Sequence, residues 1–307
     1  MVRFILLRIA RTVLTLFAVV TVVFFLTRLS GNPLEIMYGE EAISSEDWQK
    51  LKEYYGFDKS LPKQYVFYLR ELARGNFGVS IIFKRPVVEL YTQAFGKTLK
   101  LAVWVLPLSV FVGIPLGIIG ALKRRSSTGR LAMACAFIGY AVPNFILAIS
   151  FILVFSFVLK ILPSAGDATV WHFIMPTIVL SAATIAALAR YTRSSMLDVL
   201  SQDYVRTARG KGLAERSVIY KHVLRNVMIP VVTVLGLQAA HLITGSMIVE
   251  TVFSWPGIGR LIIGSVFNRD YPLLQFGVIF IASLVVMINF IVDILYVLAD
   301  PRIRVET

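Results

Sequence analysis

Six long stretches of the chain contain no Asp, Glu, Lys or Arg, and they limit its fold more than any other feature. They occupy residues 12–27, 101–122, 131–159, 168–189, 226–249 and 271–292. A helix needs about 20 apolar residues to cross the hydrocarbon core of a bilayer. The whole chain is 57% hydrophobic and only 16% charged, which is more apolar surface than a soluble globule of this size can bury. The sequence therefore predicts an all-α polytopic membrane protein and excludes a soluble enzyme.

Six transmembrane helices are expected, each built on one of these stretches. We predict them at residues 1–29, 101–122, 131–159, 168–189, 226–249 and 271–298. The third is too long for one upright helix and too short for two, so Gly139, Pro143 and Asn144 are expected to bend it, unless its first part lies shallow. The first resembles a signal peptide, but its apolar run is too long and lacks an A-x-A cleavage site, so we interpret it as an uncleaved anchor.

The basic residues orient this bundle. With the N-terminus inside, the cytoplasmic segments carry more than half of the 31 Lys and Arg residues but fewer than a third of the 18 acidic residues. An excess of Lys and Arg marks cytoplasmic loops. Both termini, including the tail 300–307, are therefore expected in the cytoplasm. The net charge of +13 then reflects these loops and anionic lipid rather than a nucleic-acid partner.

Three connecting segments are large enough to have a function. Residues 30–100 are predicted to form an external helical cap, with one helix from Ser44 to Tyr55 and another near 63–74 that ends at Gly75. Residues 190–225 form a long cytoplasmic loop. Residues 250–270 form an outer loop that looks too irregular to cross lipid, because it is interrupted by Pro256, Gly257, Gly259 and Gly264.

The sequence contains little catalytic or metal-binding chemistry. The string from Arg209 to Gly212 lacks the first glycine and the final Ser or Thr of a phosphate-binding P-loop, so we expect no ATP hydrolysis by this chain. Cys135 is the only cysteine, and the three histidines lack metal-ligand spacing. We therefore predict no catalytic residue, no metal site and no cofactor on this chain.

Polar residues in or beside the predicted fifth span are the exception. Gln238 and His241 are three residues apart and share one helical face at mid-span. Polar side chains at that depth face protein or a water-filled path rather than lipid. A structural hydrogen bond and a place in the translocation path are both open. Glu250, at the end of the span, is expected to be hydrated or to pair with Arg260 or Arg269.

The cytoplasmic loop contains a candidate docking element. Asp203 can start a short helix, Ala208 is small enough to permit close approach, and Gly212 can end the helix in the left-handed conformation. A short capped helix between two spans is typical of a docking element for a cytoplasmic partner. A solvated basic loop is the other interpretation.

This loop resembles the E-A-A-x-x-x-G motif of bacterial ABC-importer permeases. Arg206-Thr207-Ala208-x-x-x-Gly212 occupies its seven positions, and Leu224 matches the leucine twelve residues after the glycine. Arg206, Thr207 and Arg225 replace the Glu, the first Ala and a following Pro of the general motif. These departures are similar to the dipeptide/oligopeptide/nickel permease subfamily.

Four further strings carry the same resemblance, in the right order along the whole chain. They are Gly31-Asn32-Pro33, Gly75-Asn76-Phe77-Gly78-Val79-Ser80, Phe253-Ser254-Trp255-Pro256-Gly257-Ile258-Gly259 and Asp300-Pro301-Arg302-Ile303-Arg304. Asn32 stands where the subfamily more often has Asp.

The resemblance implies a permease subunit of a bacterial inner-membrane importer. Its partners would be a second related permease, two cytoplasmic ATPase subunits that bind ATP and Mg, and an external substrate-binding protein. The residues implied to couple this chain to an ATPase subunit are Asp203, Tyr204, Arg206, Thr207, Ala208 and Gly212, with Ala208 against the ATPase surface. Those implied to form an external gate or contact the binding protein are Trp255, Pro256 and Gly257.

The substrate implied by this subfamily is a di- or oligopeptide, with a nickel or other metal chelate or glutathione as alternatives. Two other classes of protein also remain open. An ion-coupled secondary carrier should show inverted repeats and deep broken helices, and a membrane enzyme should show an intramembrane cluster of His and acids. The sequence contains no internal repeat, which disfavours the carrier. His241 and Asp293 are isolated rather than clustered, which disfavours the enzyme.

Overall fold

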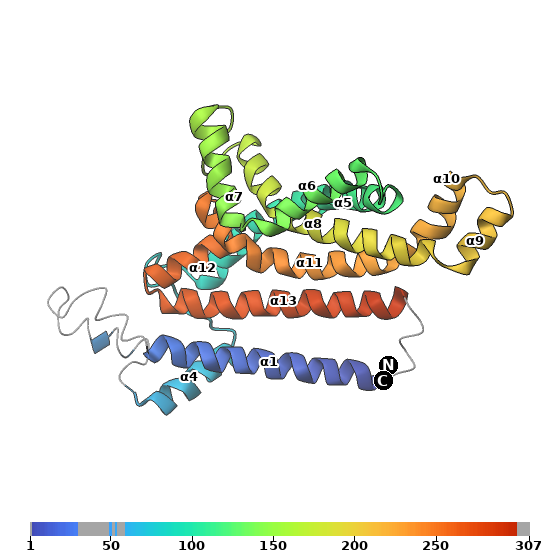
Figure 1. Cartoon of the computed structure of the whole chain (residues 1–307). Coiled ribbons are helices and arrows are strands. Elements are labelled where there is room, and N and C mark those ends of the chain that lie inside the picture. The colour runs from blue at the N-terminus through green and yellow to red at the C-terminus, as the bar shows by residue number, and fades with distance from the viewer. Residues whose placement is uncertain (1, 30–48, 51–52, 54–58, 300–307) are drawn as a thin grey trace. The chain divides into compact units, whose positions relative to one another are not determined.

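A computed structural model describes residues 2–29, 49–50, 53 and 59–299, and the structural statements below concern these residues. They are almost entirely helical (Figure 1), and a single isolated bridge joins Val79 and Pro86 in place of any strand. The chain divides into two compact units, which are described separately. Among the described residues, unit 1 contains 96–260 and 284–299, and unit 2 contains 261–283 and those that fall within 2–95. The long helices that cross these boundaries contribute residues to both units.

The helices follow the predicted order. They are α1 (Val2–Leu29), α4 (Leu61–Ala73), α5 (Val87–Leu122), α6 (Ser127–Ala141), α7 (Asn144–Phe151), α8 (Trp171–Leu200), α9 (Asp203–Gly210), α10 (Glu215–Ser217), α11 (Leu224–Val252), α12 (Ile258–Phe267) and α13 (Tyr271–Ala299), with π-helical segments η1 (Ile152–Val158) and η2 (Val218–Val223). Within the described ranges, five helices are long and apolar enough to cross a membrane, and the bent pair α6 and α7–η1 makes a sixth if it counts as one span.

The predicted bend in the third span is confirmed. The helix breaks between Ala141 and Asn144, and its two halves make an angle of 99°. Pro143 lies at the break, because its ring cannot continue the preceding helix. Gly139 has a different role from the one expected: a Cβ there would lie 2.5 Å from the carbonyl oxygen of Ala182. That glycine allows α6 to pack directly on α8.

Two helices are longer than predicted. Helix α5 begins at Val87 rather than at residue 101, and α8 continues to Leu200 rather than ending at residue 189. Arg190 and Arg193, which were expected in a loop, therefore lie on α8. A third helix, α12, occupies part of the segment that was expected to be irregular.

Glycines bring α5 and α8 of unit 1 into direct contact. A Cβ on Gly113 would lie 3.0 Å from the carbonyl oxygen of Ile185, and one on Gly117 would lie 2.6 Å from that of Ala189. Small residues at such spacing let two helix backbones approach closely. Helices α8 and α11 also pack along one another (Figure 1). These three helices form the scaffold that carries the candidate site.

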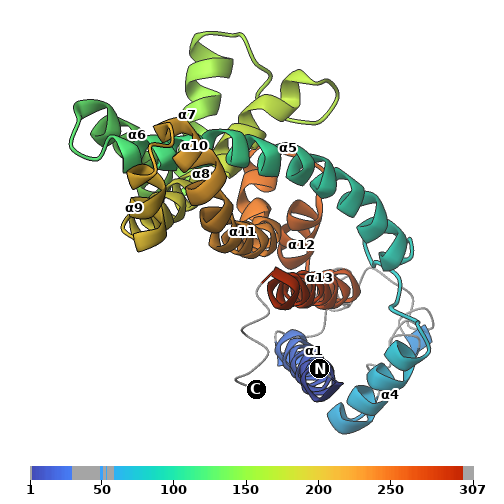
Figure 2. The ribbon, with the colours of Figure 1, turned by 90° about the vertical axis from the view of Figure 1, so that its right-hand side faces the viewer.

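Unit 2 contains α1 and α4, which lie side by side (Figures 1 and 2). The Phe24 and Tyr68 rings stack with centroids 5.2 Å apart, and the Thr21 and Tyr65 hydroxyls lie 2.7 Å apart. Helix α4 confirms the helix predicted near residues 63–74. The other predicted cap helix, at 44–55, falls largely outside the described residues.

Candidate functional site

The predicted docking helix is present in the connection between α8 and α11 (Figures 1 and 2). Helix α9 begins at Asp203, as expected, and Gly212 has a φ of +74° just beyond the end of the helix. A Cβ at Gly212 would meet no atom within 4 Å. Glycine is therefore favoured there by the left-handed backbone and not by lack of space.

One face of α9 is buried in its own chain. Val205 is fully buried and Ala208 is 6% exposed, in a cluster that also contains Met196 of α8, Val223 of η2 and Val227 of α11. The expectation that the Ala208 side chain lies against an ATPase surface is therefore wrong. Its small size instead allows α9 to lie close to the helices that carry it.

The opposite face of α9 is exposed and polar. It presents Asp203, Tyr204, Arg206 and Thr207. The Arg206 guanidinium lies 3.5 Å from the Asp203 carboxylate. The Tyr204 hydroxyl accepts a hydrogen bond of 2.8 Å from Asn226 at the start of α11. The outward face is thus fixed to the scaffold while its side chains remain accessible.

An ion pair closes the turn after α9. Arg209 donates two hydrogen bonds, of 3.0 and 2.6 Å, to the Glu215 carboxylate of α10. These bonds lower the pKa of Glu215 below its usual range and raise the pKa of Arg209. Because both groups are largely exposed, the pair adds little to stability, but it sets the direction of the chain between α9 and α10.

Gln238 and His241 line one cavity of unit 1, as their shared helical face predicted. Its volume is about 320 Å³. The lining residues are Asn144, Leu180, Ala183, Thr184, Gln238, His241, Leu242, Thr244 and Gly245, from α7, α8 and α11. His241 is exposed rather than packed in the core. The wall is mixed polar and apolar, so it can hydrogen-bond a passing solute without holding a fixed opposite charge. Its role in translocation remains a prediction.

The Trp255 loop is internal to unit 1. Trp255 is fully buried, its indole N–H donates a 3.1 Å hydrogen bond to the Lys97 carbonyl, and its ring meets Phe173 edge-on at 4.5 Å. Pro256 is half-buried and Gly257 is buried. In this conformation the Trp255 side chain offers no surface to an external protein. A role of this loop as a gate remains a prediction.

Glu250 fixes this loop by hydrogen bonds, a role that the sequence did not predict. The side chain is fully buried, so it is neither hydrated nor paired with Arg260 or Arg269 as a surface carboxylate. It accepts hydrogen bonds from the Thr98 hydroxyl at 2.7 Å and from the backbone N–H groups of Gly259 and Arg260 at 2.8 and 3.3 Å. The glycines after Pro256 were the available signal, since they let the backbone come this close.

Gly257 shows how tightly this carboxylate is enclosed. A Cβ there would lie 2.4 Å from the Glu250 carboxyl carbon. The Thr98 hydroxyl also accepts a hydrogen bond of 3.0 Å from the Ile258 N–H. One acid thus joins the end of α11, the start of α12 and helix α5.

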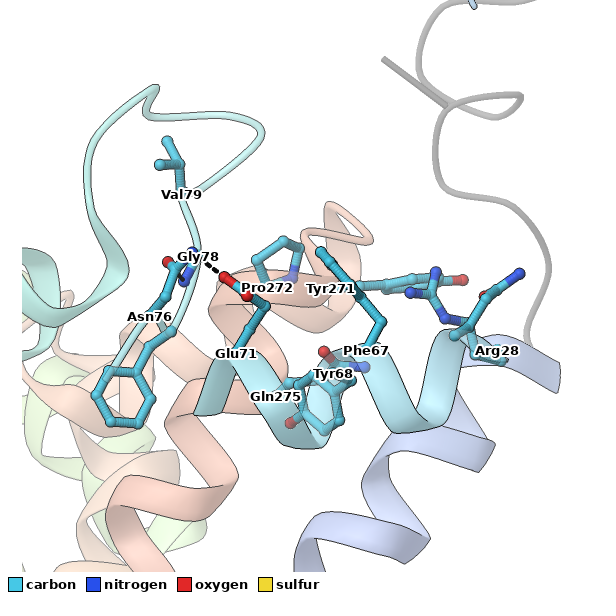
Figure 3. A pocket seen from close by; sticks show the side chains of 12 residues that line it. Arg28, Phe67, Tyr68, Glu71, Asn76, Gly78, Val79, Tyr271, Pro272 and Gln275 are labelled. Carbon is cyan, nitrogen blue, oxygen red and sulfur yellow. Dashed lines mark hydrogen bonds between the residues drawn. The ribbon is translucent and has the colours of Figure 1, made fainter. Parts of the chain in front are cut away.

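A second cavity, of about 330 Å³, lies in unit 2 between the end of α1, α4 and the start of α13 (Figure 3). Part of its wall is the string that begins at Gly75. Asn76 donates a 2.7 Å hydrogen bond to Glu71 of α4 and accepts one of 3.2 Å from the Gly78 N–H. Gly75 and Gly78 both have positive φ. This string is therefore a tight turn that fixes the chain after α4.

No group of three or more His, Cys, Asp or Glu side chains in the described part of the chain is placed to hold a metal ion.

Family profiles match nearly the whole chain. The profile of the binding-protein-dependent transport system inner membrane component matches residues 113–305, and that of the N-terminal part of such membrane components matches residues 1–102.

Individual relatives agree with these profiles. The chain is 37% identical over 336 residues to the dipeptide transport system permease protein DppB of Escherichia coli (strain K12), covering 99% of both chains. It is 40% identical over 305 residues to the glutathione transport system permease protein GsiC of Escherichia coli (strain K12), again covering 99% of both.

Solved structures with a similar fold include the MetNI methionine ABC transporter in inward-facing conformations. The TM-score is 0.60 at 17% identity, over 70% of this chain and 98% of that chain. An amino acid ABC transporter gives 0.53 at 16% identity, over 68% and 94%.

Proposed function

This chain belongs to the family of binding-protein-dependent transport system inner membrane components, and from that premise we propose how it takes part in import. It is a multi-pass permease subunit of an ABC importer in a bacterial inner membrane. We propose that it forms half of a path for di- or oligopeptides. The supporting observation is that α8 and α11 carry both the cavity with Gln238 and His241 and, between their other ends, the exposed face of α9.

The proposed partners are those that membership of this family implies. A second, related permease subunit completes the path, and two cytoplasmic ATPase subunits bind ATP and Mg in place of this chain. The exposed face with Asp203, Tyr204, Arg206 and Thr207 docks on one of them, while Gly212 sets the exit of the chain from the docking helix. An external substrate-binding protein delivers the solute, and the loop of Trp255, Pro256 and Gly257 gates its entry.

A peptide substrate is favoured by the two relatives. One is named for dipeptide and the other for glutathione, and both compounds are small peptides with amide groups and free carboxylates. The cavity wall carries amide, hydroxyl and imidazole groups, which suit such solutes. A nickel or other metal chelate is the alternative cargo. An ion-coupled secondary carrier is not favoured, because its fold would not explain the similarity to ABC permeases over nearly the whole chain.

The proposed orientation predicts the result of reporter fusions. A reporter fused after Thr307 or within residues 123–130 should give a signal only if it is one that works in the cytoplasm. A reporter fused within residues 40–52 should give a signal only if it is one that works outside, because the basic residues cluster on one side. Paired alkaline phosphatase and fluorescent-protein fusions measure this. A cytoplasmic signal from the 40–52 fusion would overturn the six-span topology.

A place for His241 in the path predicts a transport defect without an assembly defect. His241→Ala should lower peptide uptake several-fold, because the cavity loses one hydrogen-bonding partner worth about 1 kcal/mol. The assay is uptake into vesicles containing the complete importer, with co-purification of the subunits as the assembly check. His222→Ala, in the α10–α11 connection, is the matched control. Unchanged uptake by His241→Ala would favour a purely structural role, and total loss of nickel uptake would favour the metal-chelate cargo.

A further inference from the structure

Arg190 lies on α8, inside a helix that is apolar enough to cross a membrane. The helix continues to Leu200, so this arginine is ten residues, or about 15 Å, from the α8 end. Its side chain is exposed and forms no ion pair with any carboxylate in the described part of the chain. It is the first charged residue after the uncharged run 168–189, so it lies at the proposed cytoplasmic end of this span, where a long basic side chain keeps its charged head in water.

Two exposed tyrosines flank this arginine. The guanidinium carbon lies 5.4 Å from the ring centroid of Tyr140 on α6 and 5.3 Å from that of Tyr191. Tyr140 is 61% exposed and Tyr191 is 44% exposed. The rings hold the cation by cation–π attraction, and they leave its N–H groups free to donate to an arriving oxyanion.

In the cluster of Tyr140, Arg190 and Tyr191, the two residues on α8 share the helical face that lines the cavity. Ala183 and Thr184 of α8 line the cavity, and Arg190 and Tyr191 each come seven residues after one of them. Residues seven apart share one face of a helix, about 10 Å along its axis. Tyr140 lies in the last turn of α6, beside the break that supplies Asn144 to the same wall.

We propose that this cluster is a carboxylate-binding station between the cavity and the docking helix α9. A guanidinium binds a carboxylate with two parallel hydrogen bonds, and the free carboxylate of a small peptide is the group that would use it. The tyrosine rings add a surface for an apolar or aromatic side chain of the same peptide. This assignment rests on the proposed function, since it supposes that the solute passes along α8.

The test uses the single cysteine of the chain. Cys135 is replaced by Ala, and Tyr140→Cys then places the only thiol of this subunit beside Arg190 in the assembled importer. The thiol should react with both a sulfonate and a trimethylammonium methanethiosulfonate. Arg190→Gln should slow the sulfonate reagent about tenfold, because the attracting charge is lost, and leave the cationic reagent as fast or faster. A transported dipeptide should protect the thiol, whereas its amino-acid amide, which lacks a free carboxylate, should not.

Matched variants separate this inference from the proposed function. Phe137→Cys is one turn earlier on the same helix and equally exposed, and Arg190→Gln should not alter its reaction with the sulfonate. If Tyr140→Cys reacts with neither reagent, or reacts equally with and without Arg190, the station does not exist. Peptide uptake by the Cys135→Ala parent then still supports the permease function. If the parent transports no peptide, the proposed function fails instead, whatever the thiol does.

Discussion

Thr207→Trp should abolish coupling to the ATPase while leaving this subunit folded in the membrane. Thr207 is on the exposed face of α9, so the indole adds bulk where the ATPase subunit is proposed to dock. Within its own chain, the substitution removes one hydrogen bond of 2.9 Å to the Asp203 carbonyl. We expect ATP hydrolysis stimulated by the loaded binding protein, and uptake with it, to fall at least tenfold, as for a residue central to an interface.

Ala208→Trp should fail for a different reason, although it is the neighbouring residue. Ala208 faces the buried cluster of Val205 and Val223, so an indole there overpacks the chain itself, at a cost of about 3 kcal/mol or more. Its yield and thermal stability should drop together with coupling.

The control for both variants is Thr128→Trp, an exposed threonine in the first turn of α6. It should behave as the parent protein. If Thr207→Trp keeps full stimulated hydrolysis and uptake, α9 is only a solvated surface helix and the docking proposal is wrong.

Glu250→Ala should destabilise the subunit by on the order of 4 kcal/mol, the largest effect expected of any single truncation described above. The variant leaves the Thr98 hydroxyl and the N–H groups of Gly259 and Arg260 without their acceptor, and hydrogen bonds to a charged group are worth about 1.5–3 kcal/mol each. Thermal unfolding of the purified importer measures the loss. Glu250→Gln should recover part of it, because the amide oxygen can still accept from both N–H groups.

Glu89 provides the matched carboxylate. It lies at the start of α5, where it is exposed and bonds only to neighbours on the surface, including Arg85 at 2.6 Å. Glu89→Ala should change stability by less than about 0.5 kcal/mol. Equal unfolding temperatures for Glu250→Ala and Glu89→Ala would show that the buried network does not hold the loop.

The spans were predictable because lipid imposes a simple condition on sequence. A run of about 20 residues without charge has few alternatives to a helix. Four of the six runs lie wholly within helices, and the runs 131–159 and 168–189 are helical except at the break near Pro143 and at a few terminal residues. The break at Pro143 was predictable as well, since it depends on one local ring. The left-handed conformation of Gly212 was predictable for the same reason, because a positive φ is a local property of a single residue.

Helix ends were less predictable, since a charge stops an apolar run without stopping a helix. Glu89 and Lys97 lie on α5, and Arg190 and Arg193 lie on α8. The helix α12 was missed for a related reason: Gly259 and Gly264 were interpreted as irregularity. A Cβ on Gly259 would in fact lie 2.3 Å from the Cα of Met247, so this glycine serves close packing of a regular helix.

Burial of polar side chains could not be predicted, because it depends on pairs far apart in the chain. Glu250 meets Thr98 only after α5 and α11 have packed. Asp270 shows the same in unit 2, where it is fully buried and bonds to the Ser80 hydroxyl. The inward direction of Ala208 has the same origin, since it depends on where η2 and α11 lie under α9.

Because α8 is one uninterrupted helix, a small rotation at one end displaces the other end by a larger distance. Thr184 at the cavity and Leu200 next to α9 are sixteen residues apart on one helix, or about 24 Å along a stiff rod. A tilt of about 5° around the α9 end would therefore displace the cavity wall by about 2 Å, roughly the radius of a small functional group. If α9 docks on an ATPase subunit as proposed, a small movement there would open or close the proposed passage without any bend in α8.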